Sequence, residues 1–205
     1  MFIQHKCDFG EQNSQKLSLG GRLQLGRHER NSGLVAGLIA DALGLAPERC
    51  RLIERATALH DIGKVFLPAH IFEKAGPLDA AEEALMRMHP LTGHAFLKSR
   101  RGSPILELGA YIALVHHERW DGSGYPFGRV GAEIELPGRI AAIGDIYAAL
   151  RESRPYKGGL SHDQAIEIIT EEFAGKIDAL VINAMMKCEN NIREIIDDRE
   201  IAHQL

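Results

Sequence analysis

Apolar residues recur at helical spacing along most of this chain. In residues 28–43 they lie three and four positions apart, and Gly44 is suited to end the helix that this spacing predicts. Pro47 opens a second predicted helix, which ends near His60 with Gly63 just beyond it. No stretch alternates apolar and polar residues over the length of a strand. The pattern therefore predicts an all-α domain.

The rest of the chain predicts further helices. Asp79 is a candidate N-cap followed by Glu82 and Glu83, which favour a helix N-terminus, and His89 lies on that helix or its continuation. The remaining helices are predicted at residues 104–117, 137–150, 162–173 and 177–196. The apolar stripe of the last helix predicts core closure in its first half, and its second half would allow a homodimer surface.

Length and composition predict one domain. A chain of 205 residues with 45% hydrophobic content can bury a single sizeable core. Residues 1–22 are polar, contain several glycines and show no sustained period, so they are interpreted as an N-terminal tail or arm. The domain is accordingly expected at residues 23–205.

Charge and cysteine content exclude several kinds of partner and location. The formal net charge of −4 argues against DNA and against a membrane surface as general partners. The cysteines are widely spaced and fit no zinc-finger or redox pattern, which favours a reduced, cytoplasmic location: Cys7, Cys50 and Cys188. The first residues lack the hydrophobic region of a signal peptide, and no apolar run reaches the length of a membrane span.

Histidines and aspartates gather in four motifs that accompany separate apolar segments. The motif HHERWDGSGYP, from His116 to Pro126, places two adjacent histidines at a predicted helix end, where both can face one cavity. HDIGK begins at His60, HPLTG begins at His89, and Asp145 lies within GDIYAAL. A lone HD dipeptide is common by chance, and a lone histidine on an apolar helix is usually a core residue. Four such motifs in this order instead predict a metal site.

This combination of motifs resembles the HD-GYP subgroup of the HD phosphohydrolase superfamily, over roughly residues 24–181. The resemblance implies an HD-domain helical bundle with additional C-terminal helices, and metal-dependent phosphodiesterase activity on cyclic di-GMP. It assigns one metal to His28, His60, Asp61 and Asp145, and a second metal to Asp61, His89, His116 and His117. In this scheme Asp61 bridges two divalent metals, and a bridging hydroxide is the nucleophile. Imidazole and carboxylate ligation with open positions suits Fe or Mn.

The resemblance also implies how the substrate is held. Lys64, one helical turn beyond Asp61, would contact a phosphate and assist the leaving oxygen, so both residues are predicted catalytic groups. Arg154 and Lys157 match further phosphate contacts of the family, and with Arg119 they supply local positive charge. The GSGYP loop offers an aromatic wall suited to a guanine base.

Three positions depart from the family pattern. Gln24 stands where many relatives place a glutamate that helps to hold a third metal, and an amide is a weaker ligand. A dinuclear site is therefore expected, with linear pGpG as the main product. Asn31 and Ala148 replace a frequent arginine and aspartate, and these changes would alter the support of the ligands without removing one.

Two other functions stay open at this point. A protein of this fold could bind cyclic di-GMP or a signalling protein with little turnover, or it could hydrolyse another nucleotide. The complete ligand set argues against a binding protein with little turnover, and the GYP loop argues against a hydrolase of another nucleotide. Because such proteins frequently carry a sensory domain, this chain either stands alone or works with a fused or separate sensory partner. Glu118 is expected to be solvated or to orient His117.

Overall fold

Helices form the regular structure throughout the part of the chain that is described. The computed structural model describes residues 19–72, 74, 76–100, 102–152 and 159–202. Among these residues no strand forms, and an isolated bridge joins Asp121 to Val130. The α-helices are α1 (Leu19–Ala42), α2 (Pro47–Thr57), α3 (Ala69–Phe72), α4 (Ala80–Met86), α5 (His89–Lys98), α6 (Pro104–Val115), α7 (Leu136–Arg151), α8 (His162–Glu171), α9 (Ala179–Lys187) and α10 (Glu189–Ala202). Two 3₁₀ helices, η1 (Ile62–Phe66) and η2 (Gly131–Glu133), complete them.

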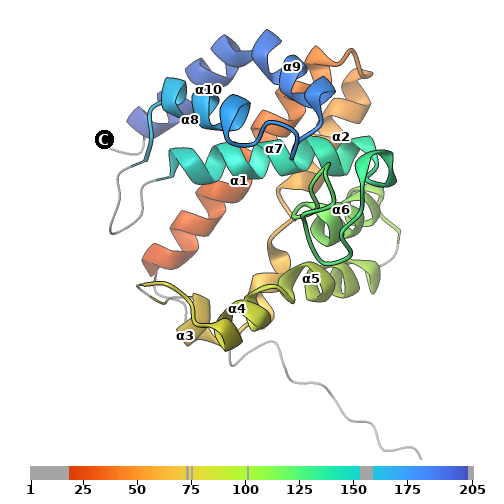
Figure 1. Cartoon of the computed structure of the whole chain (residues 1–205), viewed down its shortest axis with the longest axis vertical. Helices are drawn as coiled ribbons and strands as arrows, with labels where there is room; N and C mark the ends of the chain where they lie inside the picture. The colour runs from red at the N-terminus through yellow and green to blue at the C-terminus, as the bar shows by residue number, and fades with distance from the viewer. Residues whose placement is uncertain (1–18, 73, 75, 101, 153–158, 203–205) are drawn as a thin grey trace, which may run out of the picture.

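The core lies around α7, which passes through the centre of the molecule (Figure 1). The helix α1 packs against both α2 and α7. Val35 and Ile39 of α1 and Ile143 of α7 are fully buried in the main apolar cluster. Figure 1 shows α8, α9 and α10 on one side of α7, and α3, α4 and α5 on the opposite side. The helices α1, α2 and α6 contact α7, and α5 contacts α6 and η1.

The first helix begins earlier than the apolar spacing predicts. It starts at Leu19 rather than near His28, so its backbone is helical through Gln24. Gly20, Gly21 and Gly26 interrupt the apolar period in this stretch and conceal the helix from a reading of the sequence. Residues 1–18 of the predicted tail lie outside the described residues.

The predicted C-terminal helix at residues 177–196 is wrong as a single element. The chain forms α9 and α10, separated at Cys188, whose φ of −114° and ψ of 14° leave the helical region. This break lets apolar residues of both helices enter the same core, where Ile192 and Ile196 are fully buried. The second half of the stripe therefore closes the core as well, and a homodimer stays a prediction without support from these two side chains.

The helices around the middle of the chain follow the predicted pattern. Asp79 caps α4: its carboxylate accepts hydrogen bonds from the Ala81 and Glu82 amides, and the Glu82 side chain accepts one from the Asp79 amide. His89 is the first residue of the next helix, α5. The helix α6 ends at Val115, and His116 is its C-cap.

Within the described residues, no helix combines the length and the apolar character that crossing a membrane requires.

Candidate metal centre

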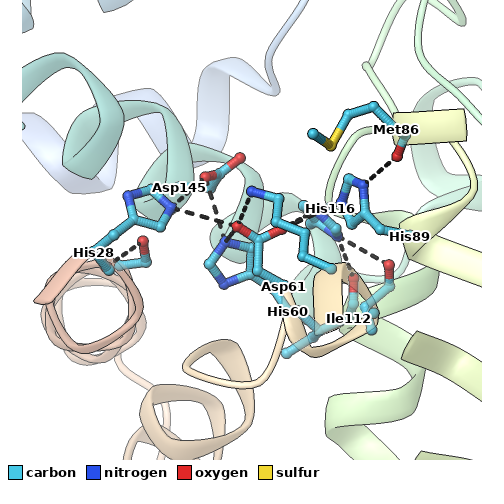
Figure 2. Close-up of polar contacts among 12 residues, drawn as sticks. His28, His60, Asp61, Met86, His89, Ile112, His116 and Asp145 are labelled. Carbon is cyan, nitrogen blue, oxygen red and sulfur yellow. Dashed lines mark hydrogen bonds and ion pairs between the residues drawn. The ribbon is translucent and has the colours of Figure 1, made fainter. Parts of the chain in front are cut away.

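Seven histidine and aspartate side chains from five parts of the fold meet at one site. Figure 2 shows His28 and Asp145 on one side of Asp61, and His89 and His116 on the other. Within each of two groups the potential ligand atoms lie within 4.8 Å of one another. One group contains His28, His60 and Asp145, and the other contains Asp61, His89, His116 and His117. The structure thus brings together every residue that the sequence predicted as a metal ligand.

Asp61 lies between the two groups, and each of its oxygens faces one of them. Its Oδ2 atom is 3.3 Å from His60 Nε2 and 3.9 Å from His28 Nε2. Its Oδ1 atom is 3.2 Å from His89 Nε2 and 3.7 Å from His116 Nε2. A carboxylate placed in this way can contact two cations at once, as a bridging ligand requires.

Backbone carbonyls fix the proton positions of three of the imidazoles. His60 Nδ1 lies 2.8 Å from the Thr57 carbonyl, His89 Nδ1 lies 2.7 Å from the Met86 carbonyl, and His116 Nδ1 lies 2.9 Å from the Ala113 carbonyl. A carbonyl only accepts hydrogen bonds, so each Nδ1 must donate. In the neutral ring the Nε2 atom then presents a lone pair toward the site.

The positions of these lone pairs show whether the residues are suited to bind a metal. His89 Nε2 and His116 Nε2 lie 3.2 Å apart, and two lone pairs at that distance repel each other. His60 Nε2 and Asp61 Oδ1 are buried and make no hydrogen bond. Buried polar atoms without partners are costly, and a divalent cation between them would satisfy the nitrogen and oxygen atoms together. The residues present therefore fit bound divalent metals.

Burial and neighbouring charges set the ionisation of the site. Burial lowers the pKa of His117 to about 3. Burial also holds the pKa of His116 well below its usual value, and the nearby imidazoles of His117 and His60 lower it further. Burial alone would raise the pKa of Asp145, but the hydrogen bond from His28 and the nearby imidazole of His60 hold it well below its usual value. Neutral imidazoles and ionised carboxylates are the states that bind cations.

Metal uptake by this site should weaken as the pH falls. Burial would lower the pKa of His60, but Asp61 and Asp145 raise it well above its usual value, so a metal must displace a proton from this ring. Affinity should therefore rise with pH until the pKa of His60 is passed. Mn²⁺ titrations between about pH 5 and 8 should show metal content and activity falling together toward acid. Full metal content with lost activity at low pH would contradict this explanation.

The positively charged residues that the sequence analysis placed near the substrate have different surroundings. Lys64, in η1, forms an ion pair with Asp61 Oδ2, and its side chain remains 23% exposed. Burial would lower the pKa of Lys64, but the Asp61 charge raises it, so the ammonium stays charged. Arg119 is instead used locally, because its guanidinium donates to the His116 and Glu118 carbonyls at 3.1 and 3.0 Å. Arg154 and Lys157 lie outside the described residues.

Glu118 has a role that the sequence analysis missed. It is 2% exposed, so the expectation of a solvated side chain is wrong, and no hydrogen bond to His117 is found among the described residues. Its two oxygens accept hydrogen bonds from the Phe127 amide at 2.8 Å and the Arg129 amide at 3.0 Å. The one sequence feature that could have indicated this role is the position of Glu118, directly after the two histidines and before the glycine-rich loop.

The positions that depart from the family pattern lie close to the ligands along the chain. Asn31 on α1 is 8% exposed and Ala148 on α7 is 3% exposed, and these two helices pack against each other. Gln24 precedes His28 by four residues on the same helix, α1. Residues at this spacing share one face of a regular helix, and a role for Gln24 at the site stays a prediction.

Comparisons with known proteins agree with this geometry. The family described as HD domain matches residues 9–181. The cyclic di-GMP phosphodiesterase response regulator RpfG of Xanthomonas campestris is 39% identical over 161 residues, which cover 78% of this chain and 42% of that protein. A cyclic di-GMP phosphodiesterase of Thermotoga maritima is 41% identical over 170 residues, which cover 82% of this chain and 46% of that protein. The chain thus spans less than half the length of these relatives.

A solved structure supports the fold. The Vibrio cholerae protein V-cGAP3, described as a cyclic GMP-AMP specific phosphodiesterase, matches with a TM-score of 0.63 and 15% sequence identity. The match covers 88% of this chain and 50% of that one. At this identity the likeness shows the fold alone, and it confirms the predicted all-α bundle of the HD-domain type.

Proposed function

Because this chain belongs to the HD-domain family, in its HD-GYP subgroup, we propose that it hydrolyses cyclic di-GMP with two divalent metals. The proposed main product is linear pGpG, and the proposed metals are Fe or Mn. Relatives named as cyclic di-GMP phosphodiesterases support the substrate, at about 40% identity over most of this chain.

The observation that carries the proposal is the position of Asp61 between the two groups of ligands. His28, His60 and Asp145 would hold one metal with Asp61, and the second metal would be held by Asp61, His89, His116 and His117. Divalent metals in such a site supply an activated water and draw charge from a phosphate. The protein orients the imidazoles through the carbonyls of Thr57, Met86 and Ala113.

Lys64 is proposed to act on the phosphate. Its ammonium lies against the Asp61 oxygen that faces His28 and His60, and it stays partly exposed. A charged ammonium at this position would attract a phosphate oxygen and stabilise the charge that develops on it during cleavage. It would also offer a proton to the leaving oxygen.

Substrate panels test the proposal directly. We expect the metal-loaded protein to convert cyclic di-GMP to pGpG much faster than it cleaves 3′3′-cGAMP or pGpG. Preference for 3′3′-cGAMP would replace the proposed substrate by the one named in the description of the Vibrio cholerae protein V-cGAP3. Tight binding of cyclic di-GMP without product would identify a binding module. Cleavage of unrelated nucleotides alone would identify another HD hydrolase.

Arg154→Ala and Lys157→Ala should each weaken substrate binding without changing metal content. Each residue is proposed to contact a phosphate outside the metal ligands, so its loss should raise KM more than it lowers kcat. Steady-state kinetics on cyclic di-GMP, with metal analysis of the same preparations, measure both effects. If both variants show the kinetics of the unmodified protein, Arg154 and Lys157 do not contact the substrate.

Gln24→Glu should shift the product from pGpG toward GMP. The added carboxylate would provide anionic ligation one helical turn before His28 and raise occupancy of a third metal position. Chromatography of the products and metal analysis measure the two changes. A third metal in the unmodified protein would refute the dinuclear assignment, and an unaltered product ratio would show that Gln24 does not control the second cleavage.

Partners and location remain predictions. Since the chain spans less than half of its relatives' length, the proposed sensory or signalling partner could be fused or separate. The cytoplasmic location rests on the scattered cysteines alone.

A further inference from the structure

His117 is held differently from the other histidines of its group. His89 and His116 each donate from Nδ1 to a backbone carbonyl, which fixes the plane of the ring. Within the described part of the chain, neither ring nitrogen of His117 makes a hydrogen bond. Metal-binding imidazoles ordinarily need such a partner to fix their orientation. Something else must hold this ring.

The ring of Tyr125 lies against His117 from outside the ligand group. The two ring centres are 4.5 Å apart and the planes are inclined by only 20°, which is a stacked arrangement. The rings of His89 and His116 also lie near His117, but at inclinations of 85° and 41°. The Arg87 guanidinium in turn lies 4.4 Å from the centre of the Tyr125 ring. A parallel stack restricts rotation of the imidazole out of its plane.

One close approach and three hydrogen bonds hold Tyr125 in this position. The Tyr125 amide donates to the His117 carbonyl at 3.2 Å. Gly124 lies so close to residues 117–119 that an added Cβ would be 2.4 Å from the Glu118 Cα and the Arg119 nitrogen. Beyond Tyr125, the buried Glu118 carboxylate binds the amides of Phe127 and Arg129. The loop is therefore fastened to the histidine pair on both sides of the aromatic ring.

We propose that Tyr125 is a positioning residue for His117, and that Glu118 acts through it by fastening the loop. The stack keeps the imidazole in the orientation that a metal at this group requires, in place of the carbonyl contact that orients His89 and His116. The inference rests on the proposed metal site, but it concerns metal affinity and not the identity of the substrate.

Calorimetric titration of the metal-free full chain with Mn²⁺ tests the proposal. Tyr125→Leu removes the stack and should weaken one of the two binding events by roughly tenfold or more, while the other keeps its affinity. Tyr125→Phe retains the ring and should bind both equivalents as the unmodified protein does. Ser123→Ala removes an exposed hydrogen bond to Asp121 in the same loop, and it serves as the matched control.

A double-mutant cycle tests the role of Glu118. Glu118→Ala should weaken the same binding event, and adding it to Tyr125→Leu should cause little further loss, because both changes remove one stack. If Glu118→Ala does not fold, the two tyrosine variants still decide the role of Tyr125.

Several outcomes would overturn the assignment. Unchanged metal affinity in Tyr125→Leu, with a raised KM for cyclic di-GMP, would make the ring a substrate contact alone. An equal loss in Tyr125→Phe would mean that the hydroxyl and not the stack matters. Fully additive losses in the double variant would separate Glu118 from Tyr125. A protein that binds two Mn²⁺ without cleaving cyclic di-GMP would refute the proposed function and leave the positioning role intact.

Discussion

Asp61→Ala is expected to remove both metals and to lower cyclic di-GMP turnover more than about 100-fold. Loss of a residue that only supports a metal ligand costs up to about 100-fold, and loss of the ligand itself should cost more. Each oxygen of Asp61 faces one ligand group, so a single change removes an anionic ligand from both. Lys64 would also lose the carboxylate with which it pairs. Metal analysis and turnover measured on the same preparation give both quantities.

Two further variants sharpen that expectation. Asp61→Asn preserves the shape of the side chain but removes its charge, and it should resemble Asp61→Ala if the charge holds the metals. Asp163→Asn changes an exposed aspartate that pairs with Arg193 at the surface, and it should leave metal content and turnover unchanged. Two equivalents of metal retained in Asp61→Ala would rule out the bridging position.

The predicted ligands could be found from the sequence because their chemistry is concentrated in short motifs. His60 with Asp61, and His116 with His117, are neighbours in the chain at the ends of apolar segments. Helices fix the direction of such segments, so the motifs converge once the apolar faces pack. The structure brings these residues together with His28, His89 and Asp145. The metals themselves remain part of the proposed function.

The features that escaped the sequence depend on contacts without a local pattern. Glu118 binds amides nine and eleven residues further along, and no periodicity marks such a pairing. The tautomers of His60, His89 and His116 depend on carbonyls, which every residue carries. The break at Cys188 follows from two apolar segments sharing one core, which an uninterrupted stripe does not reveal. Each of these features requires three-dimensional packing to be seen.

Gly63 presents a further contact of this kind, at the place where η1 meets α5. A Cβ atom at this position would lie 1.9 Å from the His89 carbonyl oxygen and 2.7 Å from the Gly93 nitrogen. Both are backbone atoms of a helix, so neither can move aside as a flexible side chain would. Gly63 therefore lets the segment that carries Asp61 approach the first turn of the helix that begins with His89.

Gly63→Ala is accordingly expected to destabilise the protein by about 3 kcal/mol or more, lowering Tm by roughly 6 to 12 °C. The forced separation should also move His89 away from Asp61 Oδ1, now 3.2 Å from its Nε2 atom, and so weaken metal binding. Thermal unfolding with and without Mn²⁺ measures both effects. Gly26→Ala is the matched control, because its new Cβ meets no atom within 4 Å inside α1, and it should raise stability by up to about 1 kcal/mol. If Gly63→Ala unfolds at the same temperature as the unmodified protein and binds Mn²⁺ equally well, the close approach of η1 to α5 does not hold the two ligands together.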